Sequence, residues 1–172
     1  MRLLFEMDTM DYKACGKEFV RPSARGIIIR SGKVAMVYSQ MYDYYKFPGG
    51  GIERCEDVTE ALVREVREEA GLSVLCDSVR EYGLVHRVER TDHYDADVFV
   101  QDNYYYLCEV EETPVGQKLD DYEREEGFTL KYVAPHEAIE VNRTHPHGPK
   151  NQVMLEREAR VLEMLLAEGY FN

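Results

Sequence analysis

The chain has 172 residues, 44% of them hydrophobic, and its 33 acidic and 21 basic residues give a formal net charge of −12. This length and apolar content predict one globular domain over residues 1–172. The negative charge disfavours a long nucleic acid or an anionic membrane as partner, because binding either one needs several Lys or Arg on phosphates. A small phosphate ligand is still compatible, since one bound divalent cation inverts the local field.

The N-terminal residues and the cysteines indicate the compartment. Arg2, Glu6 and Asp8 interrupt the short apolar start of the chain, which is unlike a secretory signal, and no run reaches the roughly eighteen apolar residues of a membrane span. The cysteines are spaced neither as a disulfide framework nor as a zinc site: Cys15, Cys55, Cys76 and Cys108. We therefore expect a protein of the reducing cytoplasm.

The first third of the chain predicts a hairpin, a short strand and a loop. Residues 1–20 show no assignable pattern. Two apolar runs within residues 25–38 flank a Ser-Gly turn signal, which predicts a β-hairpin. Residues 44–47 fit a short strand. The proline and three glycines of residues 48–51 predict an irregular loop whose backbone can approach a ligand closely.

The helix predicted over residues 57–70 has the clearest ends in the sequence. Asp57 is the expected N-cap, Glu60 completes a capping box, and Gly71 stops the helix. At about 100° per residue, three apolar side chains share one face, which is expected to pack on a sheet. These residues are Leu62, Val66 and Ala70.

The remaining sequence mixes strands and helices without regular alternation. Strands are expected where β-branched and aromatic residues cluster, at residues 79–88, 97–100, 104–110 and 129–133. Pro135 opens a short helix that ends near Val141. Asn151 caps a longer amphipathic helix that ends before Gly169.

Glu65, Glu68 and Glu69 cluster beside the apolar face of the 57–70 helix, because they are spaced i, i+3 and i+4. The cluster is locally unfavourable, since Glu65 and Glu69 repel each other and the last turn of a helix favours cations. A hard cation such as Mg²⁺ or Mn²⁺ would remove the repulsion, because it prefers oxygen ligands. Taken alone, however, a Glu-rich helix more often presents a solvated face.

The wider pattern favours the metal site. Gly50 is followed after five residues by Glu56, and after seven more by residues 64–72, which are Arg-Glu-Val-Arg-Glu-Glu-Ala-Gly-Leu. This spacing matches every fixed position of the Nudix box, so the chain resembles the Nudix family. If each of the fixed residues of the box occurs at about 7% frequency, the probability that a chain of this length matches all of them by chance is on the order of one in a million. The likeness extends more loosely to the flanking hairpin and the later elements.

The resemblance implies both a fold and a chemistry. The implied fold is α+β, a Nudix-like α/β/α sandwich with a mixed β-sheet between helices. The implied activity is a Mg²⁺-dependent pyrophosphohydrolase that cleaves a phosphoanhydride bond of a small nucleotide, either a nucleoside triphosphate or a nucleoside diphosphate derivative. The expected partner is thus the small nucleotide substrate, with no long nucleic acid and no membrane, and the sequence leaves a homodimer open.

The site residues implied by the resemblance fall on the box. The ligands of Mg²⁺ or Mn²⁺ are expected to be one carbonyl and three carboxylates, those of Gly50, Glu65, Glu68 and Glu69. Arg64 is expected to orient the carboxylates through charge-assisted hydrogen bonds, and Glu56 to support the loop or the metal shell. Cys55 replaces a frequent family glycine at a position that the box does not fix.

The acid that activates water is expected after the box. In Nudix enzymes this base is often an acid on a later loop, and the acidic run of residues 120–126 is the natural candidate here. Glu123 and Glu126 are the two alternatives within it. A box glutamate is a third alternative, and a merely solvated acidic loop is the plainer interpretation.

Three other groups of residues are left without an assigned role. The tyrosines of residues 42–45 and 104–106 can stack a nucleobase, although packing is their more common role. Lys46 can meet a phosphate, but a solvated lysine is the more common case. His145 and His147 lie in a Pro-rich turn without a third ligand, so we expect them at the surface.

As alternatives, the sequence leaves open other substrate classes and a protein that binds a nucleotide without catalysis. An ADP-ribose or nucleotide-sugar pyrophosphatase is one, but Arg87 stands where a proline would resemble the ADP-ribose marker. A non-catalytic module that senses a nucleotide is another, which the intact set of Glu65, Glu68 and Glu69 disfavours. RNA decapping is disfavoured by the charge and by the lack of a basic stripe.

Overall fold

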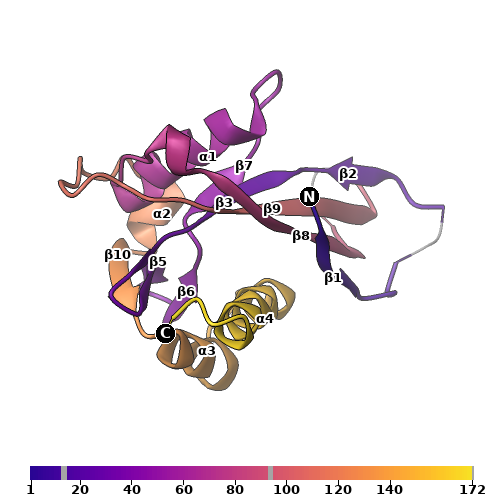
Figure 1. Cartoon of the computed structure of the whole chain (residues 1–172). Coiled ribbons are helices and arrows are strands. Elements are labelled where there is room, and N and C mark those ends of the chain that lie inside the picture. Colours follow the sequence, from indigo (N-terminus) through magenta and orange to yellow (C-terminus); the bar gives the residue numbers. More distant parts are fainter. Residues whose placement is uncertain (13–14, 93–94, 172) are drawn as a thin grey trace.

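The structure consists of strands with helices on both sides. The strands are β1 (Leu3–Asp8), β2 (Glu18–Val20), β3 (Ser23–Ile27), β4 (Ile29–Arg30), β5 (Lys33–Ser39), β6 (Tyr44–Lys46), β7 (Gly49–Gly51), β8 (Arg80–Arg90), β9 (Val98–Leu107) and β10 (Phe128–Val133). The α-helices are α1 (Val58–Ala70), α2 (Asp121–Glu125), α3 (Pro135–Thr144) and α4 (Gln152–Ala167), and a 3-10 helix covers Cys76–Ser78. Figure 1 shows this computed structural model, which describes residues 1–12, 15–92 and 95–171, with α1 on one side of the strands and α3 and α4 on the other.

The strands form two sheets. In the larger sheet the order is β1-β8-β9-β3-β7, and β2 pairs with β9 next to β3. β8 and β9 are antiparallel, whereas β1 is parallel to β8 and β3 is parallel to β9. The smaller sheet has the order β10-β5-β4, β6 also pairs with β5, and its pairs are antiparallel. The predicted mixed strand directions are confirmed, although the strands form two sheets instead of one.

Apolar side chains fill the space on both sides of the strands. The predicted face of α1 is buried in one core cluster, through Leu62, Val66 and Ala70. On the other side, the core contains Phe47 and Tyr105 from the strand layer and Leu162 from α4. The arrangement therefore confirms the predicted α+β sandwich. Within the described residues, no helix has both the length and the apolar character needed to cross a bilayer.

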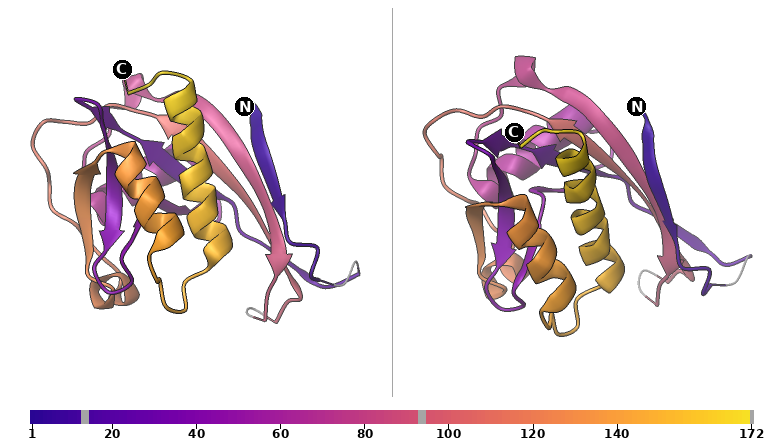
Figure 2. Two further views of the ribbon diagram at one scale, coloured as in Figure 1. Left: turned by 90° about the horizontal axis from the view of Figure 1, so that it is seen from below. Right: turned by 60° about the horizontal axis from the view of Figure 1, so that its bottom comes forward.

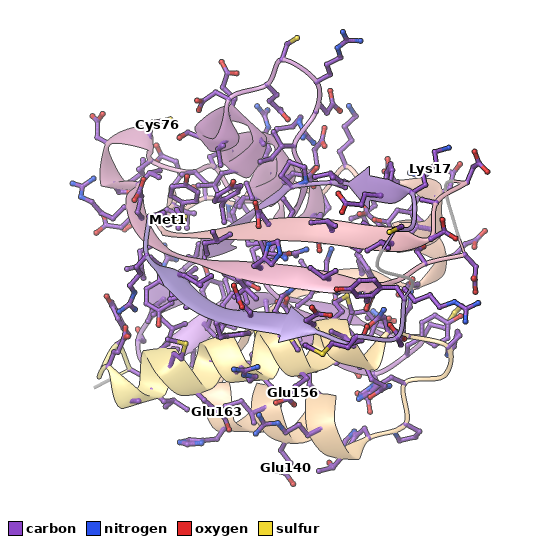
Figure 3. The ribbon with its side chains drawn as sticks, turned by 90° about the vertical axis from the view of Figure 1, so that its right-hand side faces the viewer. Met1, Lys17, Cys76, Glu140, Glu156 and Glu163 are labelled. Atoms are coloured by element: carbon purple, nitrogen blue, oxygen red, sulfur yellow. The ribbon has the colours of Figure 1, made fainter. Side chains whose placement is uncertain are left out.

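The outer part of the larger sheet extends past the helices. Figure 2 shows β1, β2 and the ends of β8 and β9 beyond α3 and α4, and Figure 3 shows α4 alongside these strands. Arg143 of α3 pairs with both Glu156 and Glu163 of α4, which ties the two helices together. The cavity that contains the box acids lies at the other edge of this sheet, where β3 pairs with β7.

The local predictions around α1 are confirmed. The Asp57 carboxylate accepts a backbone amide of the first turn at 2.7 Å, and its own amide donates to the Glu60 carboxylate at 3.0 Å. Gly71 ends the helix in the left-handed conformation, with a φ of 65°. The predicted hairpin also forms, since Arg30 of β4 pairs with Lys33 of β5 across the turn.

The glycine segment of residues 49–51 differs from its prediction as a loop. It forms β7, which pairs in antiparallel register with β3. Gly49 has a φ of 143°, and a Cβ there would overlap the Ala24 carbonyl oxygen. Glycine therefore serves here to bring two strand backbones together at the edge of the site.

Other segments also differ from their predictions. The strands expected at residues 97–100 and 104–110 are one strand, β9, because the polar residues between them continue the pairing with β8. The acidic run of residues 120–126 contains helix α2, with Asp120 at its N-cap. Residues 1–20, which have no predicted element, contribute β1 and β2 to the larger sheet.

Candidate active site

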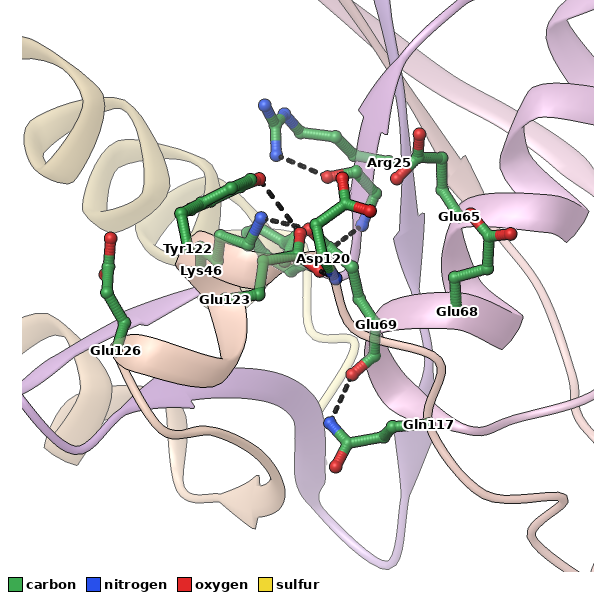
Figure 4. A network of polar contacts seen from close by, with 12 residues as sticks. Arg25, Lys46, Glu65, Glu68, Glu69, Gln117, Asp120, Tyr122, Glu123 and Glu126 are labelled. Atoms are coloured by element: carbon green, nitrogen blue, oxygen red, sulfur yellow. Dashed lines mark hydrogen bonds and ion pairs between the residues drawn. The ribbon is translucent and has the colours of Figure 1, made fainter.

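A cavity of about 780 Å³ lies between α1, β7 and α2. Its acidic lining includes Glu65, Glu68, Glu69 and Glu123, and its basic lining includes Arg25, Lys46, Arg64 and Lys118. Figure 4 shows Lys46, Glu69 and Glu123, which come from separate elements, meeting in one space. A Cβ on Gly50 would overlap the Glu65 carboxylate, so the glycine lets the box acids lie directly against the β7 backbone.

Glu69 is almost fully buried, with 2% of its surface exposed. It forms an ion pair with Lys46 and accepts a hydrogen bond from the Gly49 amide at 2.9 Å. Burial raises the pKa of Glu69 to about 7, and Glu65 adds to this, although Lys46 and the Gly49 amide favour the carboxylate. The free energy of the ionised form is therefore higher in the fold than in water.

Arg64 holds the other acids of the box. Its guanidinium donates to both carboxylate oxygens of Glu56 at 2.7 and 2.8 Å, to Glu65 Oε1 at 2.6 Å and to the Gly51 carbonyl at 3.0 Å. A longer bond of 3.4 Å reaches Glu68. Hydrogen bonding from Arg64 lowers the pKa of Glu56, whereas burial raises the pKa of Glu65. These contacts have the geometry that an orienting role for Arg64 requires.

The two candidate bases lie in different surroundings. Glu123 lines the cavity, where its Oε1 accepts a hydrogen bond from Tyr122 Oη at 2.9 Å and its Oε2 accepts the N-cap amide of α2 at 2.8 Å. Glu126 does not line the cavity, because its carboxylate accepts from Tyr44 Oη at 2.9 Å and pairs with Lys150. Figure 4 shows Glu126 well apart from the box glutamates. The structure thus separates two residues that the sequence could not rank.

Lys46 and His147 are more buried than expected. The solvated interpretation of Lys46 is wrong, since 9% of its surface is exposed and it is paired with Glu69. The surface position expected for His147 is also wrong, because its ring nitrogens lie 2.9 and 3.1 Å from two backbone carbonyl oxygens, those of Tyr42 and Asn142. His145 is exposed, as expected.

The cavity also contains residues that the sequence did not single out. The tyrosines of residues 44–45 and 105–106 are buried in the core. Among the described residues that line the cavity, the tyrosine is Tyr122. Arg25 of β3 donates to the Gly49 carbonyl at 3.3 Å. A charged residue among the small and apolar residues of this strand was the signal for it. Nothing in the sequence around Tyr122 marks it in the same way.

Comparison with known proteins identifies the family. A family model described as the NUDIX domain matches residues 20–156. The chain belongs to the Nudix family. This confirms the enzyme class, since Nudix hydrolases act on phosphorus-containing acid anhydrides. An 8-oxo-dGTP diphosphatase from Buchnera aphidicola subsp. Schizaphis graminum is 37% identical over 54 residues, which cover 29% of this chain and 42% of that protein. The match therefore spans less than half of that relative's length.

Solved Nudix structures share the fold. A MutT structure from a study of Aliivibrio salmonicida and Vibrio cholerae has a TM-score of 0.55 and 17% identity, and covers 87% of this chain and 99% of that one. A Nudix hydrolase from Nitrosomonas europaea has a TM-score of 0.55 and 19% identity, and covers 83% and 90% of the two chains. At these identities the likeness is one of fold alone, and it confirms the predicted Nudix-like architecture.

The acids of this Nudix box fit a divalent cation by their chemistry. Glu65, Glu68 and Glu69 offer the carboxylate oxygens that Mg²⁺ prefers, and burial makes the charges of Glu65 and Glu69 costly without a cation. Within the described residues, no three His, Cys, Asp or Glu side chains are grouped closely enough to hold an ion as they stand. Glu69 is held by Lys46 and Glu65 by Arg64, so an ion would have to compete with these cationic partners.

The metal-free Nudix domain is expected to lose stability as the pH rises from about 4.5 to about 7. The pKa of Glu69 is raised from 4.5 in the fold, so between these pH values the folded state binds more protons than the unfolded state. The stability that is present below pH 4.5 is therefore lost as the pH rises through 7. The loss is on the order of 3 kcal/mol. Chemical denaturation in chelator across this window should show this loss for the wild type and a smaller one for Glu69→Gln, because the pKa of Glu65 is raised as well. Parallel pH curves for the two proteins would contradict it.

Proposed function

We propose that the protein is a Mg²⁺- or Mn²⁺-dependent Nudix pyrophosphohydrolase that cleaves a phosphoanhydride bond of a small nucleotide. The observation that carries this proposal is the mixed lining of the cavity, where the box acids face cationic side chains across the β7 backbone. Acids alone would suit a cation, and cations alone would suit an anion. Both together suit a phosphoanhydride that binds with its metal ion.

The box residues would hold the ion. Its ligands would be the Gly50 carbonyl and the carboxylates of Glu65, Glu68 and Glu69. When bound, the ion supplies charge neutralisation and Lewis acidity at the phosphoryl oxygens. Arg64 would keep Glu65 and Glu68 directed toward the cavity, and Glu56 would hold Arg64 through its two short hydrogen bonds.

Other residues of the cavity would bind the substrate and accept the proton. Lys46 and Arg25 are the buried cations that can contact phosphoryl oxygens from the β3 and β6 side. Glu123 Oε1 would accept the proton of the attacking water, because it faces the cavity and already accepts a hydrogen bond from Tyr122 Oη at 2.9 Å. Glu126 is held outside the cavity by Lys150 and is not part of this proposal.

The substrate class and the location rest on other observations. The 8-oxo-dGTP diphosphatase to which part of the chain is similar acts, by its name, on a nucleoside triphosphate, which favours a triphosphate over ADP-ribose. We also propose a cytoplasmic location, on the spacing of the cysteines, and no membrane or long nucleic-acid partner, on the net charge of −12. A single domain over residues 1–172 stays part of this proposal. The homodimer stays a prediction, which sedimentation velocity can test.

A hydrolysis screen tests this function. Nucleoside triphosphates, nucleoside diphosphate sugars, ADP-ribose, dinucleotides and capped RNA are each incubated with the protein and Mg²⁺, and the products are identified by chromatography. We expect a nucleoside monophosphate and a second phosphorylated product from one of the small nucleotides, and no product in excess chelator. Tight nucleotide binding without any product would instead support the non-catalytic sensing module, and undiminished turnover in chelator would exclude a metal-dependent enzyme.

A further inference from the structure

A second, smaller cavity adjoins the catalytic one. It has a volume of about 270 Å³ and lies between β3, β8, β9 and α4. Arg21, Arg25 and Gln101 line both cavities, so the two spaces are neighbours that share a wall. The smaller cavity is further lined by Arg87 of β8 and Arg157 of α4. We call this cavity the arginine pocket.

The arginines of this pocket are unusually buried for charged residues. The exposed fractions are 7% for Arg25, 6% for Arg87 and 0% for Arg157. Arg25 Nε and Arg157 Nη1 both donate to one neutral atom, Asn103 Oδ1, at 3.2 and 2.6 Å. Two guanidinium groups therefore share an amide oxygen that carries no compensating charge.

The carboxylates in contact with these arginines do not balance their charge. Glu158 pairs with Arg157 at 2.5 Å, and Glu89 pairs with Arg87. Of the three buried guanidinium groups, those of Arg157 and Arg87 each have a carboxylate partner, whereas Arg25 has no ion pair within the described residues. An unbalanced buried charge is costly, and a ligand of opposite charge would offset that cost.

Arg87 also has a buried hydrogen-bond donor without a partner. Its buried Nε has no hydrogen-bond partner in the described part of the chain. Burial, followed by the charge of Arg157, lowers the pKa of Arg87 to about 10, although Glu89 opposes the shift. Arg87 therefore stays protonated at neutral pH and retains an unsatisfied donor next to the cavity.

We infer that the arginine pocket binds a phosphoryl group of the substrate that lies outside the scissile anhydride. The inference rests on the proposed function, because the pocket shares its wall with the proposed catalytic cavity. A guanidinium matches phosphoryl oxygens in charge and geometry, whereas a neutral nucleobase would leave the surplus charge unbalanced. The substrate class is therefore a nucleotide with a phosphoryl group beyond the two that the cleaved anhydride joins. ADP-ribose has no such group.

Binding of inorganic phosphate tests the pocket without any turnover. Calorimetric titration of the chelator-treated protein with phosphate should give a saturable site, and Arg87→Met should weaken it by about tenfold or more. Arg90→Met is the matched control, because Arg90 lies on the same strand, is exposed and pairs with Asp92 outside the pocket. Equal phosphate affinity in wild type and Arg87→Met would overturn the inference, as would the same loss in Arg90→Met.

A second variant and an inhibition experiment complete the test. If Arg87→Met does not fold, Arg87→Lys keeps a cation for Glu89 but removes the guanidinium fork, and should still weaken phosphate binding by several-fold. Phosphate should also inhibit hydrolysis competitively with the substrate, whereas non-competitive inhibition or activation would overturn the assignment to a substrate group. A hydrolysis screen without product, combined with loss of phosphate binding in Arg87→Met, would refute the proposed function and leave the anion site intact.

Discussion

Replacing Glu69 by Gln is expected to lower the turnover number about a hundredfold, which corresponds to about 3 kcal/mol of transition-state stabilisation. The substitution keeps the shape of the side chain and removes one of the three box carboxylates proposed to hold the ion. Above pH 7 the metal-free fold should be at least as stable as the wild type, because removing a charge that burial and Glu65 disfavour offsets the loss of the pair with Lys46. Turnover and metal-free stability should therefore change in opposite directions.

Two measurements on Glu69→Gln check this prediction together. Initial rates in saturating Mg²⁺ are compared with the free energy of unfolding in chelator, using the substrate that the screen identifies. A folded variant with near-wild-type turnover would contradict the metal-ligand role. Strong destabilisation in chelator would show instead that the pair with Lys46 makes Glu69 a structural residue.

Replacing Glu123 by Gln is expected to lower turnover by a factor of about 10² to 10³, the usual loss when a general base is removed. The amide cannot accept the proton of the attacking water. It keeps an oxygen that can accept the N-cap amide of α2, now bound by Glu123 Oε2 at 2.8 Å. The free energy of unfolding should therefore fall by no more than about 1 kcal/mol.

Glu126→Gln is the matched control for Glu123→Gln. It changes the same charge on the next turn of the chain, but Glu126 is bound to Lys150 and Tyr44 outside the cavity. We expect it to destabilise the fold by about 3 kcal/mol, since it breaks a buried pair, while the folded protein keeps a near-wild-type rate. The opposite result, a rate loss in Glu126→Gln and none in Glu123→Gln, would show that Glu126 is the base.

The predictions that came true concern interactions between residues close in sequence. The capping box of Asp57 and Glu60 and the left-handed Gly71 determine the ends of α1 within a few residues. The spacing of the box acids places them on one stripe for the same reason, since an α-helix repeats every 3.6 residues. These features depend little on the rest of the fold, so the sequence was sufficient to predict them.

The parts that the sequence missed depend on distant partners. β1 is ordered by parallel pairing with β8, and no local pattern in residues 1–20 specifies that partner. Lys46 is buried because Glu69, 23 positions away, receives it as an ion pair. The three glycines of β7 have little strand propensity of their own, and they pair with β3 because a side chain would not fit between the two backbones.

The arginine pocket could not be predicted from the sequence either, because its residues are distant from one another in the chain. Arg25, Arg87 and Arg157 lie on β3, β8 and α4, and they come together through Asn103 of β9 and its neighbours. In the sequence, Arg87 is notable only because it stands where a proline would resemble the ADP-ribose marker. In the structure it lines the arginine pocket, and its Nε has no hydrogen-bond partner among the described residues.

Binding of Mn²⁺ tests the central claim, that the acids of α1 hold the cation, most directly. The chelator-treated protein is titrated with Mn²⁺, and free Mn²⁺ is measured by electron paramagnetic resonance. Glu68→Gln is the variant of choice, because Glu68 is the most exposed of the three acids and its loss should leave the fold intact. Glu125→Gln, which removes an exposed carboxylate elsewhere, is the control. We predict about tenfold weaker Mn²⁺ binding in Glu68→Gln and wild-type binding in Glu125→Gln, and equal affinities in all three proteins would contradict the account.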